Sequence, residues 1–381
     1  MSMPSIKQLK ATKLVDSNGY DLVCAKDVVI KAKQWIWPGH LLRGAQELLT
    51  GIPGLGKSQT QIHFIACVSA GLAWPDGAKA LPVANVIMLT AEDVLDDEVV
   101  PRLLAANAGL DRVHILKSIK RDGQNRQFLL GDDLDILEKA VTDIGEVGLI
   151  TIDPITAFMG GKLDSHKTTE VRSQLGPLKD FAERNNIAIS TITHPAKSAG
   201  QKAIDHFIGS QAFIAAGRIG HVCAEELKED EDGSMIPTGR VLFANAKSNA
   251  HVRMPTLAYR IAETVVGQDP ATHDSIAAPR VVWEGVVDIT ADQAVGAASR
   301  GGGNDKRRKP RGEQQKVQAF LQSIMDRAQP ELDGSRTVPA KHAIEEATKR
   351  GITAEQIKTA RKNMGISSKQ TANGWVWREE F

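Results

Sequence analysis

Few features of secreted or membrane proteins occur in this sequence. Its 381 residues include three widely separated cysteines, which form no CxxC pair or disulfide framework and are expected to be buried thiols: Cys24, Cys67 and Cys223. No apolar run approaches the roughly 20 residues that cross a bilayer, and no apolar leader follows the first methionine. We therefore expect neither an integral membrane protein nor a secreted one, but a chain of the reducing cytoplasm.

The chain also has little net charge, +1 at pH 7, but this value hides an asymmetry. Residues 300–381 carry 17 Lys and Arg against 10 Asp and Glu, whereas residues 1–299 carry 30 against 36. A mildly acidic body is thus followed by a basic tail, which favours a polyanionic partner.

One break in composition divides the chain. Residues 296–312 are rich in glycine and basic residues and lack apolar periodicity, as is typical of a flexible linker. We expect a first domain over residues 1–295 and a second over residues 313–381.

Before this linker, short apolar runs alternate with amphipathic segments. The runs predict strands at Glu47–Thr50, Val86–Thr90, Val113–Leu116, Gly148–Asp153, Ile187–Thr193, Ile219–Ala224, Val241–Ala244, Leu257–Ile261 and Val281–Val286. The amphipathic segments predict helices at Lys57–Ala70, Asp97–Ala108, Asp132–Ile144, Glu170–Asn185 and His206–Ala215. This alternation indicates an α/β fold with a mostly parallel sheet that ends in antiparallel hairpins.

A phosphate-binding loop is the strongest motif. Residues 51–58, GIPGLGKS, match GxxxxGK[ST] between a predicted strand and a predicted helix, the context that the motif requires. Its glycines let backbone N–H groups and the helix N-terminus face a phosphate. Lys57 would reach the β- and γ-phosphates, and Ser58 would bind Mg²⁺. The predicted nucleotide-binding residues are Gly51, Pro53, Gly54, Leu55, Gly56, Lys57, Ser58 and Gln59.

Three further strands end in polar residues. Asp153 ends an apolar strand as a metal-binding Walker B acid does, although it could simply begin a turn before Pro154. After another strand, Glu92 is a candidate general base for the attacking water, and Asp93 a candidate helix cap. His194 follows a third strand and could contact the γ-phosphate, with a structural role as the alternative.

These motifs resemble those of a known family. The phosphate loop, LTAED, LITIDP, TITHPAKSAG, GSQAFIAAGR and ANAKSNAH occur in an order and spacing similar to RecA-like hexameric ATPases, in particular the plasmid and phage RepA-type replicative helicases related to DnaB-type helicases. The similarity covers roughly residues 30–290. It implies a RecA-like fold, a homohexameric ring and ATP-driven translocation on single-stranded DNA.

The resemblance also implies residue roles. Lys57 and Ser58 would hold phosphate and metal, Glu92 would be the catalytic glutamate, Asp153 the Walker B acid and His194 the sensor. A neighbouring subunit would supply a basic finger, for which the candidates are Arg218, Lys247 and Arg253.

Two loops could contact DNA. The loops after the Asp153 and His194 strands carry four lysines that could neutralise backbone phosphates, with ordinary solvated loops as the alternative: Lys162, Lys167, Lys197 and Lys202. For Trp35 and Trp37, which precede the phosphate loop, we favour core packing over an adenine contact.

The tail has the pattern of a helix-turn-helix. A helix at Gln315–Arg327 precedes a second helical segment, and Thr353 with Gln356 forms a capping box for the next helix. Asn373–Gly374 predicts a hairpin wing. The whole resembles a winged-helix domain whose basic residues could contact duplex DNA, although winged helices also bind proteins: Lys358, Arg361, Lys362 and Lys369.

Together these features predict a Mg²⁺- and ATP-dependent replicative DNA helicase of a mobile element, assembled as a ring, that is tethered to duplex DNA or a replication protein by its tail. The alternatives are a RecA-like recombination or repair ATPase and a DNA-binding regulator gated by nucleotide.

Overall fold

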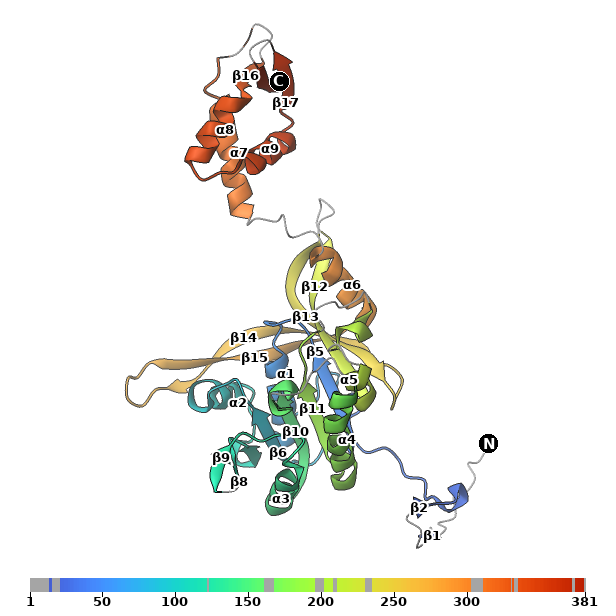
Figure 1. Cartoon of the computed structure of the whole chain (residues 1–381). Coiled ribbons are helices and arrows are strands. Elements are labelled where there is room, and N and C mark those ends of the chain that lie inside the picture. The colour runs from blue at the N-terminus through green and yellow to red at the C-terminus, as the bar shows by residue number, and fades with distance from the viewer. Residues whose placement is uncertain are drawn as a thin grey trace. The chain divides into compact units, whose positions relative to one another are not determined.

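A computed structural model describes residues 14–15, 21–121, 123–160, 168–195, 202–207, 211–229, 235–302, 311–329, 331, 335–371 and 374–379. They fall into two compact units, Met1–Arg300 and Gly301–Phe381 (Figure 1). Within these ranges no helix is both long and apolar enough to span a membrane. Cys67 and Cys223 are buried as expected, whereas Cys24 is exposed beside a short turn that has no buried residue.

A nine-stranded sheet organises the first unit. Its order is β15-β14-β13-β12-β5-β11-β10-β6-β7. The six strands from β12 to β7 pair in parallel, and β12 to β15 pair in antiparallel fashion. The strands are β5 (Gln46–Thr50), β6 (Asn85–Thr90), β7 (Val113–Ile115), β10 (Val147–Asp153), β11 (Ala188–Ile192), β12 (Ile219–Glu229), β13 (Met235–Ser248), β14 (Thr256–Gln268) and β15 (Ser275–Val287). The predicted α/β fold with a mostly parallel sheet is therefore confirmed.

Helices cover both faces of this sheet because side chains of successive strand residues point to opposite sides. Leu49 packs on the face covered by α1 (Lys57–Ala70) and α2 (Val100–Ala105). Leu48 packs on the other face, with α3 (Leu134–Ile144), α4 (Thr168–Asn185) and α5 (Gln211–Ala216). Trp37 of β3 (Trp35–Trp37) is fully buried and stacks on Trp74 at 4.8 Å, in agreement with core packing.

Some predicted boundaries differ from the structure. The segment expected as helix 97–108 begins with a π-helical turn, Leu95–Val99, and the one expected at 206–215 is split into a 3-10 turn, Ala203–His206, and α5. Helix α6 (Ala291–Gly302) covers the first part of the expected linker, since an apolar face of Ala291, Ala294 and Val295 packs on the core. Residues 303–310 of that linker lie outside the described residues.

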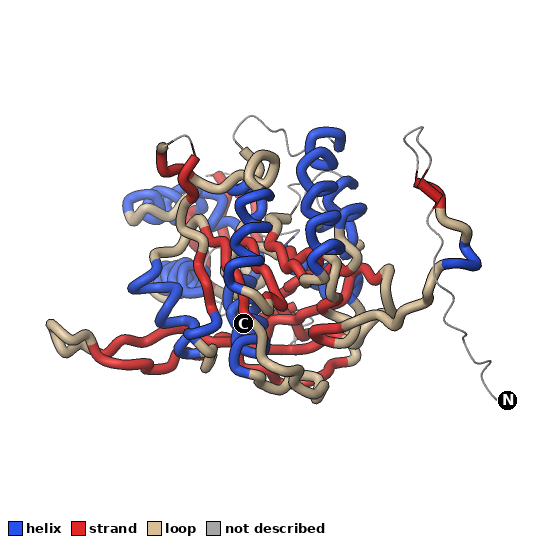
Figure 2. The backbone as a smooth tube through the Cα atoms, turned by 90° about the horizontal axis from the view of Figure 1, so that it is seen from below, coloured by secondary structure: helices blue, strands red, loops and turns tan. Residues whose placement is uncertain are grey.

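The antiparallel strands are much longer than the apolar runs that predicted them. In Figures 1 and 2 the β14–β15 hairpin crosses the α1 side of the unit and continues past α2. Both of its strands contact α2, and β15 contacts α1 as well.

The second unit is small and has its own core. It contains α7 (Arg311–Met325), β16 (Arg336–Pro339), α8 (Ala340–Lys349), α9 (Ala354–Asn363), β17 (Ser367–Thr371) and β18 (Gly374–Glu379). Phe320, Ile357 and Trp377 pack together in this core. The predicted capping box starts α9: Gln356 N–H donates to Thr353 Oγ1 at 3.3 Å, and Thr353 N–H to Gln356 Oε1 at 2.7 Å.

Candidate functional site

The carboxyl ends of the parallel strands bring the predicted site residues to one edge of the sheet. The phosphate loop follows β5, and Glu92 follows β6. Asp153 ends β10 opposite Thr90 of β6, and His194 lies two residues beyond the end of β11. Since these strands are neighbours, the four segments lie side by side.

The loop has the backbone of an anion-binding turn. Gly56 is left-handed at φ +76° and precedes Lys57, the first residue of α1, so successive N–H groups converge as a nest at the helix N-terminus. Gly51 lies so close to β12 that a Cβ there would be 2.6 Å from the Cys223 carbonyl oxygen. Both positions therefore require glycine.

Lys57 lies between the loop and two acids. Its Nζ donates to the Ile52 carbonyl oxygen at 3.0 Å, and only 8% of the residue is exposed. Burial lowers the pKa of Lys57, whereas the nearby carboxylates of Asp153 and Glu92 act in the opposite direction. The ammonium group is thus held at the loop within the field of both predicted catalytic carboxylates.

Ser58 and Asp153 are neighbours at this site. Burial raises the pKa of Asp153, and the nearby charges of Asp93 and Glu92 raise it further, against a hydrogen bond from the Ser58 hydroxyl. An alcohol and a carboxylate oxygen side by side, in a site with excess negative charge, fit the oxygen ligands that Mg²⁺ prefers beside a phosphate.

The two acids after β6 have different partners. Asp93 pairs with Arg102 Nη1 at 2.5 Å, and Arg102 also pairs with Glu98 at 3.1 Å. The expected cap at Asp93 is wrong, because the helical segment begins one residue later and the Val94 N–H donates to Glu98. Glu92 is exposed and makes no hydrogen bond or ion pair with any described residue. Its carboxylate can therefore contact solvent water.

His194 is exposed after β11, and its neighbour Thr193 was missed by sequence reasoning. Thr193 is fully buried, its N–H donates to the Leu49 carbonyl oxygen of β5 at 2.8 Å, and its hydroxyl has no partner within the described ranges. The available signal was three hydroxyl residues, Ser190, Thr191 and Thr193, in an otherwise apolar strand.

The finger candidates lie at the other end of the parallel strands, where these strands begin. Arg218 N–H donates to the carbonyl oxygen of Gln46, the first residue of β5, and the Arg218 side chain is exposed. Lys247 Nζ donates to the Ile214 and Gly217 carbonyl oxygens at the end of α5, and burial, then the charge of Arg218, lowers its pKa. Arg253 is exposed between β13 and β14. Arg218 and Lys247 therefore lie away from the phosphate loop of their own chain.

The structure describes only some of the residues that were predicted to contact DNA. Lys162, Lys167 and Lys197 lie outside the described residues, whereas Lys202 is exposed just before the Ala203–His206 turn. On α9, Lys358 and Lys362 are exposed. Arg361 is instead bound within its unit, since it donates to the Ile366 carbonyl oxygen at 2.6 Å and lies 5.9 Å from the centre of the Trp377 ring.

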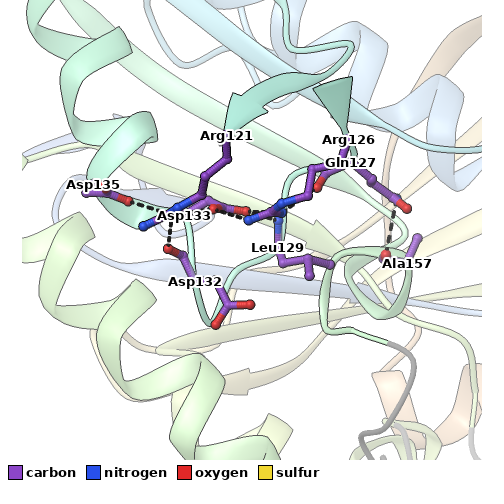
Figure 3. A network of polar contacts seen from close by, with 8 residues as sticks. All are labelled: Arg121, Arg126, Gln127, Leu129, Asp132, Asp133, Asp135 and Ala157. Atoms are coloured by element: carbon purple, nitrogen blue, oxygen red, sulfur yellow. Dashed lines mark hydrogen bonds and ion pairs between the residues drawn. The ribbon is translucent and has the colours of Figure 1, made fainter. Parts of the chain in front are cut away.

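A buried carboxylate that the sequence did not reveal anchors the segment after β7. Asp133 accepts from Arg121 at 2.7 Å and from both Arg126 nitrogens at 2.7 and 2.8 Å (Figure 3). Burial by itself would raise the pKa of Asp133, but hydrogen bonds from Arg126, Leu129 N–H and Arg121 outweigh it and lower the pKa. Gln127 then donates to the Ala157 carbonyl oxygen, which ties this segment to the turn that follows Asp153.

A second buried cluster was also missed. We name it the Glu47 cluster, and it consists of Glu47, Ser190, His221 and His40. Glu47 lies 2.8 Å from His221 Nδ1 and accepts from Ser190 at 2.7 Å, and His221 Nε2 lies 3.0 Å from His40 Nδ1. Burial raises the pKa of Glu47 to about 8 and lowers that of His221 to about 3. At neutral pH this cluster is therefore uncharged and internally hydrogen-bonded.

Comparison with known proteins agrees with the geometry. A family model described as an AAA domain matches residues 21–200, which contain the phosphate loop, Glu92, Asp153 and His194. No curated protein matches the chain. The family match and the loop together support an ATPase of the P-loop type.

Proposed function

We propose that this chain is an ATP-driven DNA motor, a ring-forming replicative helicase of a mobile element such as a plasmid or phage. The observation that carries the ATPase part is that Ser58 of the phosphate loop, Asp153 and the exposed carboxylate of Glu92 come together where the parallel strands end.

Each residue of the phosphate site would have its own role in the hydrolysis of ATP. Lys57 would exchange the Ile52 carbonyl for the β- and γ-phosphate oxygens, and Ser58 and Asp153 would hold Mg²⁺, which when bound neutralises phosphate charge. Glu92 would accept a proton as the water oxygen attacks the γ-phosphorus and the bond to the β-phosphate oxygen breaks. His194 and Thr193 would contact the γ-phosphate or this water.

A basic finger from a neighbouring copy would complete the site. Arg218 is the better candidate than Lys247, because the Lys247 ammonium group already binds the α5 carbonyls. The position of Arg218 at the far edge of the sheet supports a role in a neighbour's site, which requires an oligomer such as a hexameric ring.

DNA would bind through basic residues of both units. The lysines after β10 and β11 follow the carboxyl edge of the sheet and would contact a single strand: Lys162, Lys167, Lys197 and Lys202. We interpret the second unit, with its helix, strand, two helices and hairpin, as a winged helix. In that interpretation Lys358 and Lys362 of α9 contact duplex phosphates.

The test is the ATPase rate with and without single-stranded DNA, for wild type, Glu92→Gln and the control Asp93→Asn. Strong stimulation by DNA and a loss of roughly 100-fold or more in Glu92→Gln are expected. Asp93→Asn should lose far less, since Asp93 pairs with Arg102.

A slow ATPase rate that does not change when DNA is added would contradict the motor function and favour the nucleotide-gated regulator. A DNA-stimulated rate without strand displacement on a forked substrate would favour the recombination or repair ATPase. A Glu92→Gln variant as fast as wild type would assign the base to another residue.

A further inference from the structure

The β14–β15 hairpin touches the phosphate loop, a contact that the proposed mechanism does not use. Tyr259 of β14 is fully buried, and its hydroxyl donates to the Leu55 carbonyl oxygen at 2.6 Å. Two residues further along β14, Ile261 covers Gly56: its Cδ1 lies 2.6 Å from where a Cβ of residue 56 would be. Strand β14 therefore packs directly on the part of the loop that precedes α1.

This hydrogen bond determines which way one peptide unit faces. The Leu55 carbonyl and the Gly56 N–H belong to the same trans peptide, so they point in opposite directions. While the carbonyl is bound to Tyr259, the Gly56 N–H must point away from Tyr259. Gly56 is left-handed and Lys57 is helical, so this N–H belongs to the series that forms the anion nest.

Glycine is the residue least able to hold such an orientation by itself, because it rotates freely through conformations that other residues avoid. A loop with glycines at positions 51, 54 and 56 would otherwise lose much conformational entropy on binding a phosphate. An external hydrogen bond that selects one orientation of the peptide in advance reduces that loss.

The surroundings of Tyr259 keep its hydroxyl a donor. Burial raises the pKa of Tyr259 well above its ordinary value, and burial likewise raises the pKa of the Cys223 thiol to about 11. The Cys223 sulfur accepts from the same hydroxyl at 3.4 Å, so the shorter bond to the Leu55 carbonyl oxygen is the stronger of the two. Trp283 holds the tyrosine ring edge to face at 5.1 Å.

We propose that Tyr259 is a positioning residue of the phosphate site: its hydroxyl holds the Leu55–Gly56 peptide so that the Gly56 N–H is ready for a phosphate. The inference rests on the proposed function only in requiring that the loop binds nucleotide. It links nucleotide binding to the β14–β15 hairpin, more than 200 residues away along the chain.

The experiment compares two variants of the full chain. Tyr259→Phe removes the hydroxyl but keeps the ring against Trp283. Thr256→Val is the matched control, since it removes a buried hydroxyl that donates to the Ile289 carbonyl oxygen from the same strand, away from the loop. The readouts are the Kd for Mg-ADP and for Mg-pyrophosphate, which carries only the phosphates, and the thermal unfolding midpoint of each protein without ligand.

Tyr259→Phe should bind both ligands roughly three- to tenfold more weakly, the worth of one hydrogen bond. Thr256→Val should bind them as wild type does, even though its unfolding midpoint falls by a similar amount. Unchanged affinity in Tyr259→Phe, or an equal loss of affinity in both variants, would overturn the positioning role of Tyr259 but leave the proposed function standing. If wild type bound neither ligand, the proposed function would fall as well.

A second measurement keeps Tyr259 in place, so it tests the proposal even if Tyr259→Phe folds poorly. The chain has two tyrosines, Tyr20 and Tyr259, so labelling the ring carbon that bears the hydroxyl gives two NMR signals. Tyr20→Phe leaves the Tyr259 signal, which should shift when Mg-pyrophosphate binds. A Tyr259 signal that does not move on saturation of the loop would contradict the proposal.

Discussion

Two polar clusters border strand β5, one buried and one open to solvent at Glu92, and they differ in how completely their groups are paired. In the Glu47 cluster the carboxyl group has both a histidine and a serine partner, and the network continues through His221 to His40. The phosphate site begins at Gly51, directly after the end of the strand. There Asp153 has the Ser58 hydroxyl but also two neighbouring acids, and Glu92 is unpaired within the described residues.

The difference indicates what each cluster is for. Buried polar groups cost free energy unless they are paired, so a cluster that is complete by itself stabilises the fold. A cluster in which carboxylates outnumber cations costs stability, and such a cluster is typical of a site that binds a cation. Substitutions in the first cluster should therefore change stability, and substitutions in the second should change activity.

The largest expected effect is at the incomplete cluster. Asp153→Asn keeps an acceptor for Ser58 but removes a carboxylate that would hold Mg²⁺, so the ATPase rate should fall by about 100-fold or more. The free energy of unfolding should stay the same or rise, because an unfavourable buried charge is gone. Steady-state ATPase assays and urea denaturation measure the two quantities, with Asp111→Asn, at an exposed surface pair, as the control. A variant that lost stability instead would contradict the distinction.

The next effect is at the complete cluster. His221→Ala leaves Glu47 without its histidine partner and opens a cavity beneath α1, so the free energy of unfolding should fall by about 2–4 kcal/mol. The ATPase rate per folded molecule should stay within a few-fold of wild type. His114→Ala on the edge strand β7 is the control and should cost less than about 1 kcal/mol. A large loss of activity in folded His221→Ala would mean that the two clusters act together.

Dependence on pH sharpens the comparison further. Burial raises the pKa of Glu47 from 4.5 to about 8, so between these values the folded chain holds a proton that the unfolded chain releases, and stability from this group falls as pH rises. Burial lowers the pKa of His221 to about 3, so the stability from this group rises with pH, but only below pH 6.5. Between pH 6.5 and 8 wild type should therefore lose up to about 2 kcal/mol through Glu47.

Glu47→Gln removes that proton exchange while keeping an amide that can bond His221. Denaturation curves at pH 6.5, 7.25 and 8 should show a smaller loss of stability for the variant than for wild type. Parallel curves for the two proteins would show that Glu47 does not take up the proton.

The contrast also explains what the sequence could predict. The phosphate loop and the acids that end β6 and β10 are short local patterns between apolar runs, so each was recognisable by itself, and parallel pairing then brought them to one edge. The Glu47 cluster joins residues from three strands and a turn, and Tyr259 reaches the loop across 204 positions. Such contacts depend on register and packing, which local patterns do not contain. The sequence likewise did not show that Lys247, one of the finger candidates, is bound to the carbonyl oxygens at the end of α5.

The smallest effects should appear in the second unit, where the same distinction separates two bases of α9. Arg361 is bound to the Ile366 carbonyl and lies by the Trp377 ring, so Arg361→Ala should lower the stability of that unit by about 1 kcal/mol. Lys358 is exposed, and Lys358→Ala should leave stability within about 0.5 kcal/mol. If α9 contacts duplex DNA, Lys358→Ala should weaken binding equally on different sequences and reduce the slope of log affinity against log salt by about 1. Fluorescence anisotropy on two unrelated duplexes over a salt series measures this slope, and an unchanged slope would favour a protein partner for α9.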